Sequence, residues 1–191
     1  MMGNMNAHQI DHQSNESPRI YVASLADYNA GYLHGRWIDA DQPLDDIQKE
    51  VAEMLAESRE PCAEEWAIHD YEGFESVRLS EFADLEHVSK VACAITEHGP
   101  ILAGLVDHFG GIRHVEEALR YLEDGYSGEF ESLTEYAEQF IDDCYSDVLK
   151  DLPDFIRCHI DYECIGRDME LSGDIFTIQQ GGMVHVFQSH I

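Results

Sequence analysis

The chain has 191 residues, of which 39 are Asp or Glu and only 11 are Lys or Arg, so its formal charge is −28 at pH 7. This charge disfavours binding to nucleic acid or to an anionic membrane, because both are negatively charged themselves. Apolar residues make up 44% of the chain, and the acidic residues lie within apolar-periodic segments rather than in a disordered tail. The composition therefore predicts a folded protein with a positively charged partner.

The first segment, residues 1–18, is polar and without hydrophobic periodicity, and we predict a flexible tail there. It lacks the apolar run of a secretory signal, and no stretch of the chain approaches the about 20 apolar residues of a membrane-spanning helix. The 5 cysteines form no C-x-x-C pair, and their odd number is typical of reduced thiols. We therefore expect a cytoplasmic protein.

The segment 19–80 predicts a small sheet with one helix across it. Strands are expected at RIYVASL, HGRWIDA and EEWAIHDYEGF, with DYNAGY as the turn between the first two. A helix is expected to open at Pro43, with Asp41 as its cap. Its apolar residues fall on one stripe at helical spacing: Ile47, Val51, Met54 and Leu55.

The segment 81–125 predicts a helical middle region. A helix is expected to start at Ser80, and Gly99 marks its end. Two further short helical stretches follow, PILAGLVDHFGG and IRHVEEALRYLEDG, each closed by glycine.

The segment 126–191 predicts helices followed by a C-terminal β-hairpin. Residues 132–149 have helical spacing, and a second helix is expected after Pro153, continuing through HIDYECIGRDMEL. GDIFTIQQGGMVHVF then reads as a hairpin with Gly181-Gly182 at the turn. The fold class is therefore α+β, with a tail (1–18) and an elongated row of three small domains (19–80, 81–125 and 126–191).

Catalytic and metal-binding motifs are missing from the sequence. H-E-x-x-H, calcium loops, G-x-S-x-G and phosphate-binding glycine loops do not occur. His159 with Glu163, and Cys158 with Cys164, have spacings that are not diagnostic of a metal site. Cys62 lies in an acidic stretch, which does not favour a reactive thiolate. We predict no catalytic residue, no metal, no cofactor and no enzymatic activity.

Two acidic rows are the informative pattern. Asp46, Glu50, Glu53 and Glu57 follow one another at i, i+4, i+7 and i+11, away from the apolar stripe of their helix. The long helix near residues 132–149 carries a second row, formed by Glu131, Glu135, Glu138 and Asp142 with Asp143 and Asp147 beside it. Like charges at this spacing cost a few tenths of a kcal/mol per pair, and we expect no Lys or Arg to relieve them. Two such rows indicate a selected function.

We predict that the partner-binding surface is made of carboxylates spread along the chain. The predicted residues are Asp45, Asp46, Glu50, Glu53, Glu57, Glu60, Glu64, Glu116, Glu117, Glu123, Asp124, Glu129, Glu131, Glu135, Glu138, Asp142, Asp143, Asp147 and Asp151. Duplex DNA carries one charge per about 1.7 Å of its axis, so the charge of this chain matches roughly 48 Å of duplex. An elongated chain could present such an array, whereas a compact globule of this mass could not.

Several segments resemble the ArdA family of antirestriction proteins. The resemblance rests on PRIYVASLADYNAGYLHGRWIDA, EEWAIHDYEGF and MELSGDIFTIQQGGMVHVF, and it covers about residues 18–188. It implies a DNA mimic of mobile genetic elements that competitively occupies the DNA-binding groove of type I restriction–modification enzymes. It also implies three small domains in a curved row and a homodimer joined through the C-terminal domain.

Two other functions remain open on the sequence alone. One is an acidic chaperone or interaction module for basic DNA-binding proteins, which shares the charge but needs no fixed array. The other is a hydrolase that uses a cysteine or a metal. We interpret Trp37, Trp66, Tyr71 and Phe74 as core residues, and the pair His69-Asp70 as structural. We expect Arg36 and Arg19 to steady nearby carboxylates.

Overall fold

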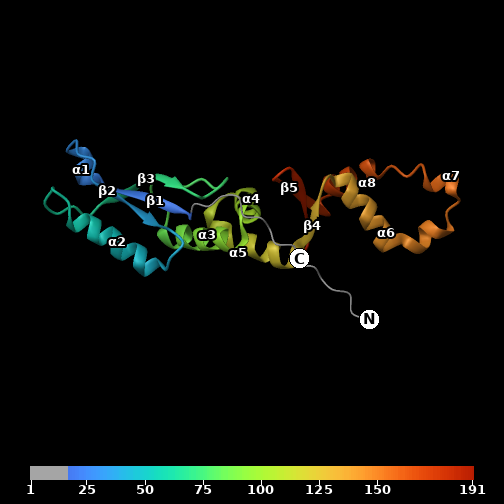
Figure 1. Cartoon of the computed structure of the whole chain (residues 1–191), viewed down its shortest axis with the longest axis horizontal. Coiled ribbons are helices and arrows are strands. Elements are labelled where there is room, and N and C mark those ends of the chain that lie inside the picture. The colour runs from blue at the N-terminus through green and yellow to red at the C-terminus, as the bar shows by residue number, and fades with distance from the viewer. Residues whose placement is uncertain (1–16) are drawn as a thin grey trace. The chain divides into compact units, whose positions relative to one another are not determined.

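A computed structural model describes residues 17–191, which divide into two compact units (Figure 1). Unit 1 is the described part of Met1–Glu75 together with Ser80–Gly99, and unit 2 is Ser76–Leu79 together with Pro100–Ile191. Unit 1 contains β1 (Arg19–Ser24), α1 (Leu25–Asn29), β2 (Gly35–Asp39), α2 (Leu44–Ala56), β3 (Trp66–Glu72) and α3 (Leu85–His98). Unit 2 contains α4 (Pro100–His108), η1 (Ile112–His114), α5 (Val115–Arg120), η2 (Tyr121–Gly125), β4 (Tyr126–Phe130), α6 (Leu133–Asp151), α7 (Asp154–Arg157), α8 (Tyr162–Ser172), β5 (Ile175–Gln180) and β6 (Met183–Gln188).

Unit 1 is built on a three-stranded antiparallel sheet in the order β2-β1-β3. The central strand β1 supplies Ile20 and Val22, both fully buried, and α2 packs on this sheet through the buried stripe of Ile47, Val51 and Met54. The predicted sheet with a helix across it is therefore confirmed.

Three local predictions for the helices of unit 1 are wrong. Pro43, not Asp41, is the N-cap of α2, and it makes no side-chain cap bond. Residues in the expected turn DYNAGY instead begin a short helix, α1, because the Ser24 hydroxyl accepts a hydrogen bond from the Asp27 N–H. The helix α3 begins at Leu85 rather than near Ser80.

Asp84 determines the start of α3. Its Oδ1 accepts hydrogen bonds from the backbone N–H groups of Glu86 (3.0 Å) and His87 (3.2 Å). The residues before it are held elsewhere, since Ile68 in β3 donates its N–H to the Glu81 carbonyl at 2.8 Å. The predicted end is confirmed, because Gly99 caps α3 with a φ of 73°.

Unit 2 contains a second antiparallel sheet in the order β4-β6-β5. The predicted hairpin is confirmed as β5 and β6, and Gly181 and Gly182 make its turn with φ values of 60° and 85°. The strand β4 was not predicted. It is short and interrupted by Gly128, whose φ is 130°, so its sequence gives almost no alternating pattern.

Rings from several elements of unit 2 form one aromatic cluster. Phe176 of β5 stacks on His108 of α4 (ring centroids 4.4 Å apart) and on Phe187 of β6 (5.1 Å). Tyr121 of η2 meets Phe176 at 5.5 Å, and Phe109 lies 4.9 Å from Tyr121. The helices after Gly99 and the C-terminal sheet therefore share a core.

The helices of the C-terminal region differ in detail from the expected pair. The long helix α6 is confirmed, with Ser132 as its N-cap, but it bends at Tyr145, which has non-helical backbone angles. The segment predicted to continue after Pro153 is two helices, α7 and α8, and Asp161 caps the second by accepting from Cys164 N at 3.0 Å. The helices α6 and α8 pack closely at Gly166, where an added Cβ would lie 2.8 Å from the Leu133 carbonyl oxygen.

The observed fold confirms the mixed α+β class with two small sheets. The division into three domains with boundaries at 80 and 125 stays a prediction. The predicted tail lies outside the described residues except for Ser17 and Pro18, and the Pro18 carbonyl accepts a hydrogen bond from Ala40 N at 2.8 Å.

Candidate partner-binding surface

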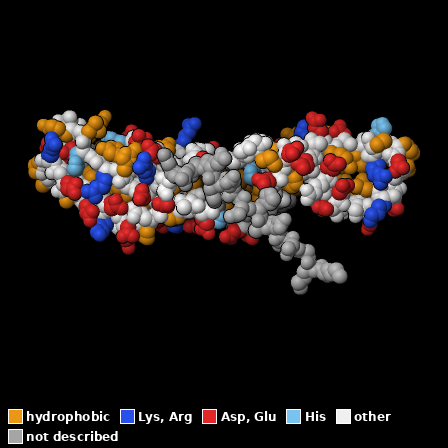
Figure 2. Space-filling view, in the orientation of Figure 1, with side chains coloured by type: hydrophobic (Ala, Val, Ile, Leu, Met, Phe, Trp, Pro, Cys, Tyr) orange, Lys and Arg blue, Asp and Glu red, His pale blue; other side chains and the backbone are white. Residues whose placement is uncertain are grey.

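The carboxylates predicted to form the binding surface face solvent. All of them are exposed except Glu50, Glu60 and Glu117, which are half-buried. Figure 2 shows Asp and Glu side chains over the visible face of both units, with Lys and Arg scattered among them. The acidic side chains are thus available to a partner.

The first acidic row lies on α2 and is partly compensated, which corrects our expectation that no cation relieves it. Arg36 of β2 reaches across to Glu53 (3.5 Å) and to Glu57 (2.9 Å). Lys49 lies 4.0 Å from Glu53, and the Gln42 amide donates to Glu50 at 2.8 Å. The sheet therefore supplies counter-charge to the C-terminal half of the row.

The expectation that Arg36 and Arg19 steady nearby carboxylates is confirmed. Arg19 binds Glu72 Oε2 through its Nη2 at 2.6 Å and its Nε at 2.9 Å, which joins the start of β1 to the end of β3. The Arg19 guanidinium also lies 4.8 Å from the centroid of the Trp37 ring. The two arginines thus act between elements of unit 1.

The second row is less regular than predicted. Glu131 precedes α6, and its backbone N–H donates to Glu135 Oε2 at 2.6 Å, so Glu135 folds back over the helix start. Glu138, Asp142 and Asp143 continue along the exposed surface of the helix. Lys150 pairs with Asp147 at 2.9 Å, which again corrects the expectation of an unrelieved row.

Tyr162 of α8 was not predicted to belong to this surface. Its pKa is raised by burial and then by the charges of Asp142 and Glu138 on α6. The two carboxylates therefore share their surroundings with a phenol hydroxyl. The sequence gives no sign of this arrangement, because a tyrosine is uncharged and does not extend the pattern of acidic residues.

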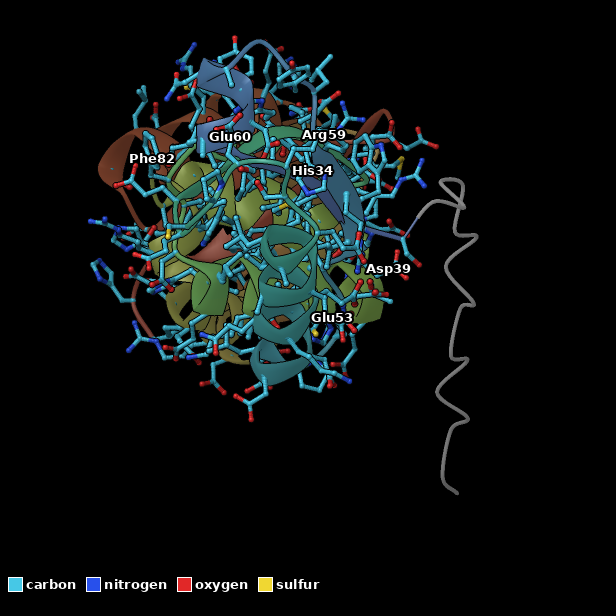
Figure 3. All side chains as sticks on the ribbon, turned by 90° about the vertical axis from the view of Figure 1, so that its left-hand side faces the viewer. His34, Asp39, Glu53, Arg59, Glu60 and Phe82 are labelled. Atoms are coloured by element: carbon cyan, nitrogen blue, oxygen red, sulfur yellow. The ribbon has the colours of Figure 1, made fainter. Side chains whose placement is uncertain are left out.

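Asp27 is a carboxylate that sequence reasoning left unassigned, and it has a structural role. It is fully buried, accepts from the Ser58 hydroxyl at 2.5 Å and accepts from the Arg59 N–H at 3.2 Å. The Ser58 hydroxyl is the main reason that the pKa of Asp27 lies below its usual value. Asp27 thereby ties α1 to the segment that follows α2, near which Figure 3 shows His34, Arg59 and Glu60.

The residues considered for catalysis are arranged as structural or surface groups. His69 is exposed and meets the Tyr28 ring edge-on at 4.9 Å, while Asp70 accepts the N–H of Tyr71. Cys158 Sγ lies 3.2 Å from His159 Nδ1, and both side chains are exposed on the turn after α7. Within residues 17–191, no group of three or more His, Cys, Asp or Glu side chains is placed to hold a metal ion.

The aromatic residues interpreted as core are buried to different degrees. Phe74 is buried, which confirms the interpretation for that residue. Trp37, Trp66 and Tyr71 are half-buried. Trp66 therefore belongs to the surface as well as to the fold.

The fold and surface describe an acidic α+β protein that presents its carboxylates on two small folded units. No helix within residues 17–191 is long and apolar enough to cross a membrane. A profile of the ArdA antirestriction proteins matches residues 20–184. The chain belongs to this family, as its sequence resemblance predicted. A search of curated proteins returned no match.

Proposed function

We propose that the protein inhibits type I restriction–modification enzymes by occupying their DNA-binding groove as an acidic mimic of B-form DNA. The observation that carries the proposal is the exposure of the predicted carboxylates in a chain of the ArdA family. A groove that binds DNA phosphates is basic, so it attracts such a surface over long range and speeds association. Inhibition then requires displacement of DNA and no chemistry.

The placement of the carboxylates favours a mimic over a general chaperone for basic proteins. The row on α2 stands on a helix whose other side is anchored to a sheet, and Arg36 holds Glu57 in a defined position. Ser132 and Glu135 fix the start of α6, which carries Glu138 and Asp142. A fixed array suits a groove that reads DNA geometry, whereas a chaperone needs only charge.

A competition experiment tests the proposal. A type I methyltransferase with its labelled recognition duplex is titrated with the full-length protein, and the bound DNA is followed by gel shift. We expect DNA to be released in proportion to the protein added, with steeply weaker competition at higher salt because exposed charges are screened beyond about 10 Å at 0.1 M. Inhibition of the enzyme while DNA stays fully bound contradicts the mimicry.

The same titration distinguishes a mimic from a general acidic binder. A basic protein that binds DNA without a duplex-shaped groove, such as purified lysozyme, serves as the comparison. A mimic binds the methyltransferase much more tightly than lysozyme at the same salt concentration. Equal affinities for the two would favour the chaperone function.

We also propose a homodimer joined through the C-terminal region 126–191. The hairpin of β5 and β6 buries Ile175, Val186 and Phe187 within unit 2, so these side chains are not available to a second copy. Exposed apolar side chains occur instead on α6, α7 and α8: Tyr145, Val148, Phe155, Ile156 and Leu171. These residues are the better candidates for a symmetric apolar contact with charges at its rim.

Sedimentation across a salt series tests the dimer. Two acidic surfaces repel one another, so dimer content should rise with ionic strength while enzyme binding falls. Phe155→Ala should shift the protein towards monomer, and Leu33→Ala, at an exposed position of unit 1, should not. A monomer at micromolar concentration and every ionic strength would contradict the proposal.

A further inference from the structure

Unit 1 contains an open groove that the acidic rows do not use. It has a volume of about 400 Å³ and is lined by Leu44, Gln48, Trp66, Phe82, Ala83, Asp84, Leu85 and Glu86. Its residues come from the start of α2, the start of β3 and the segment that leads into α3.

The groove lies on a different flank of α2 from the acidic row. Successive residues of an α-helix are separated by about 100° around its axis. Leu44 and Gln48 therefore point to one side of the buried stripe, and Glu53 and Glu57 to the other. A partner that contacts only the row would leave the groove free.

Phe82 is the most unusual side chain of the groove. It is 71% exposed, although the backbone around it is firmly held. On one side, Ile68 donates its N–H to the Glu81 carbonyl, and on the other, Ala83 is buried and Asp84 caps α3. Figure 3 shows Phe82 at the margin of the fold, well away from Asp39. An exposed aromatic ring on a fixed backbone loses little conformational freedom when a partner binds it.

The charges around the groove are mainly negative. Asp84 and Glu86 line it, and their side chains are 61% and 58% exposed. The pKa of Asp84 is lowered, chiefly by the backbone N–H of His87, so its carboxylate is charged at neutral pH. Lys90 lies 3.2 Å from Glu86 and offsets part of this charge. Glu65 and Glu81, the sequence neighbours of Trp66 and Phe82, are exposed as well.

We propose that this groove binds a basic segment of a protein partner, with one aromatic or large aliphatic side chain of that segment between Trp66 and Phe82. Leu44, Trp66 and Phe82 contact the side chain, and the carboxylates of Asp84 and Glu86 take the Lys or Arg residues on either side of it. Aromatic anchors in such pockets contribute much of the affinity of protein interfaces. The inference concerns a contact apart from the acidic rows and does not rest on the proposed function.

Peptide titration of the full-length ¹⁵N-labelled protein tests the groove. Three synthetic peptides serve as probes: a phenylalanine flanked by Lys and Arg, the same peptide with alanine at the centre, and the phenylalanine peptide with Glu flanks. The readout is the indole N–H resonance of Trp66, and the other tryptophan, Trp37, is an internal control outside the groove. We expect the basic phenylalanine peptide to shift Trp66 but not Trp37.

Two variants sharpen the test. Phe82→Ala should weaken binding of the basic phenylalanine peptide by at least about fivefold, the loss that marks an important interface residue. Leu33→Ala removes an apolar side chain that is 81% exposed in the same unit but outside the groove, and it should leave the affinity unchanged. Both positions are exposed, so neither substitution should unfold the protein.

Each alternative result overturns the inference. If the phenylalanine and alanine peptides bind with equal affinity, no apolar side chain anchors the segment in the groove. If the Glu-flanked peptide binds as tightly as the basic one, the carboxylates around the groove do not select a basic partner. A Trp66 shift that follows protein concentration without peptide means that a second copy of the chain fills the groove. Competition with methyltransferase DNA is measured separately: its failure in the unaltered protein contradicts the proposed function and leaves the peptide result standing.

Discussion

The two units carry the same formal charge but compensate it differently. Among the described residues, unit 1 has 18 carboxylates against 5 Lys and Arg, and unit 2 has 19 against 6, so each has a formal charge of −13. In unit 1, Arg19 and Arg36 form ion pairs between separate elements of the fold. In unit 2, Lys150 and Arg157 pair with carboxylates three residues away on their own helices.

The cores of the two units also differ in their packing. Unit 1 packs aliphatic side chains of α2 on a sheet and buries a carboxylate, Asp27, with its hydrogen-bond donors. Unit 2 also buries aliphatic side chains, such as Leu102 and Leu105 of α4, and adds to them a cluster of stacked rings around Phe176. The comparison teaches that two units of equal charge, each with an aliphatic core, add different contacts to it: ion pairs and a buried carboxylate between elements in unit 1, and a cluster of stacked rings in unit 2.

The largest effect is expected from removing a ring of the aromatic cluster. Phe187 is fully buried between Phe176 and Tyr126, so Phe187→Ala should lower the free energy of unfolding by about 3–5 kcal/mol. Ile47→Ala in the core of unit 1 should cost about 2–5 kcal/mol. Urea denaturation followed by circular dichroism measures both. If Phe187→Ala lowers the free energy of unfolding no more than a surface substitution does, the aromatic cluster does not stabilise unit 2.

Neutralising a group of carboxylates should weaken inhibition, and more so in unit 2. Glu138→Gln, Asp142→Asn and Asp143→Asn together should cost about 0.6–3 kcal/mol of binding, at about 0.2–1 kcal/mol for each exposed charge contact. The matched triple change in unit 1 is Asp46→Asn, Glu53→Gln and Glu57→Gln. Its effect should be smaller, since Arg36 already offsets two of these charges.

Competition with methyltransferase-bound DNA measures both triple variants, and thermal unfolding checks that they are folded. A single amide substitution that abolished inhibition in a folded protein would indicate a localised site and would contradict a distributed surface. An equal loss from the two triple variants would mean that Arg36 does not shield its row.

Acid should destabilise the two units over different pH ranges. Burial lowers the pKa of His185 and raises the pKa of Tyr126 to about 12, and the Tyr126 hydroxyl lies 2.8 Å from His185 Nδ1. The unfolded chain therefore binds a proton first, and stability is lost as the pH falls below about 6.5. The lowered pKa of Asp27 gives stability that is present above about 3.9 and lost as the pH falls further.

Thermal midpoints between pH 7 and pH 3 test these ranges. His185→Phe should flatten the decline between pH 7 and pH 5, and Asp27→Asn should lower the midpoint at pH 7 and flatten the decline near pH 4. If the thermal midpoint of His185→Phe falls between pH 7 and pH 5 as steeply as that of the unaltered protein, groups other than His185 cause the decline.

The smallest effect is expected from the surface arginine of unit 1. Arg36→Gln should cost about 0.2–1 kcal/mol of stability, since its partners are exposed, and should strengthen binding to a basic partner at low salt by freeing Glu53 and Glu57. Lys150→Gln is the control, because its pair with Asp147 spans three residues of one helix and should contribute less. Urea denaturation and the competition assay measure both variants. A larger loss of stability from Lys150→Gln would reverse the comparison between the units.

The sequence by itself determined the family, the mixed fold class and the elements with strong local patterns. The apolar stripe through Ile47 and Val51 predicted α2, and paired glycines predicted the hairpin of β5 and β6. The exposure of the acidic residues also followed, since a carboxylate is seldom buried without partners. These features depend on short-range periodicity, which a single segment contains completely.

Only the tertiary structure decided which charges are compensated and which rings are free. Arg36 is 17 and 21 residues away from the carboxylates that it contacts, and Arg19 is 53 away from Glu72. The burial of Asp27, the addition of β4 to the hairpin and the exposure of Phe82 depend equally on distant segments. Such contacts arise from the packing of whole elements against one another, and the local pattern of residues around each partner contains no record of them.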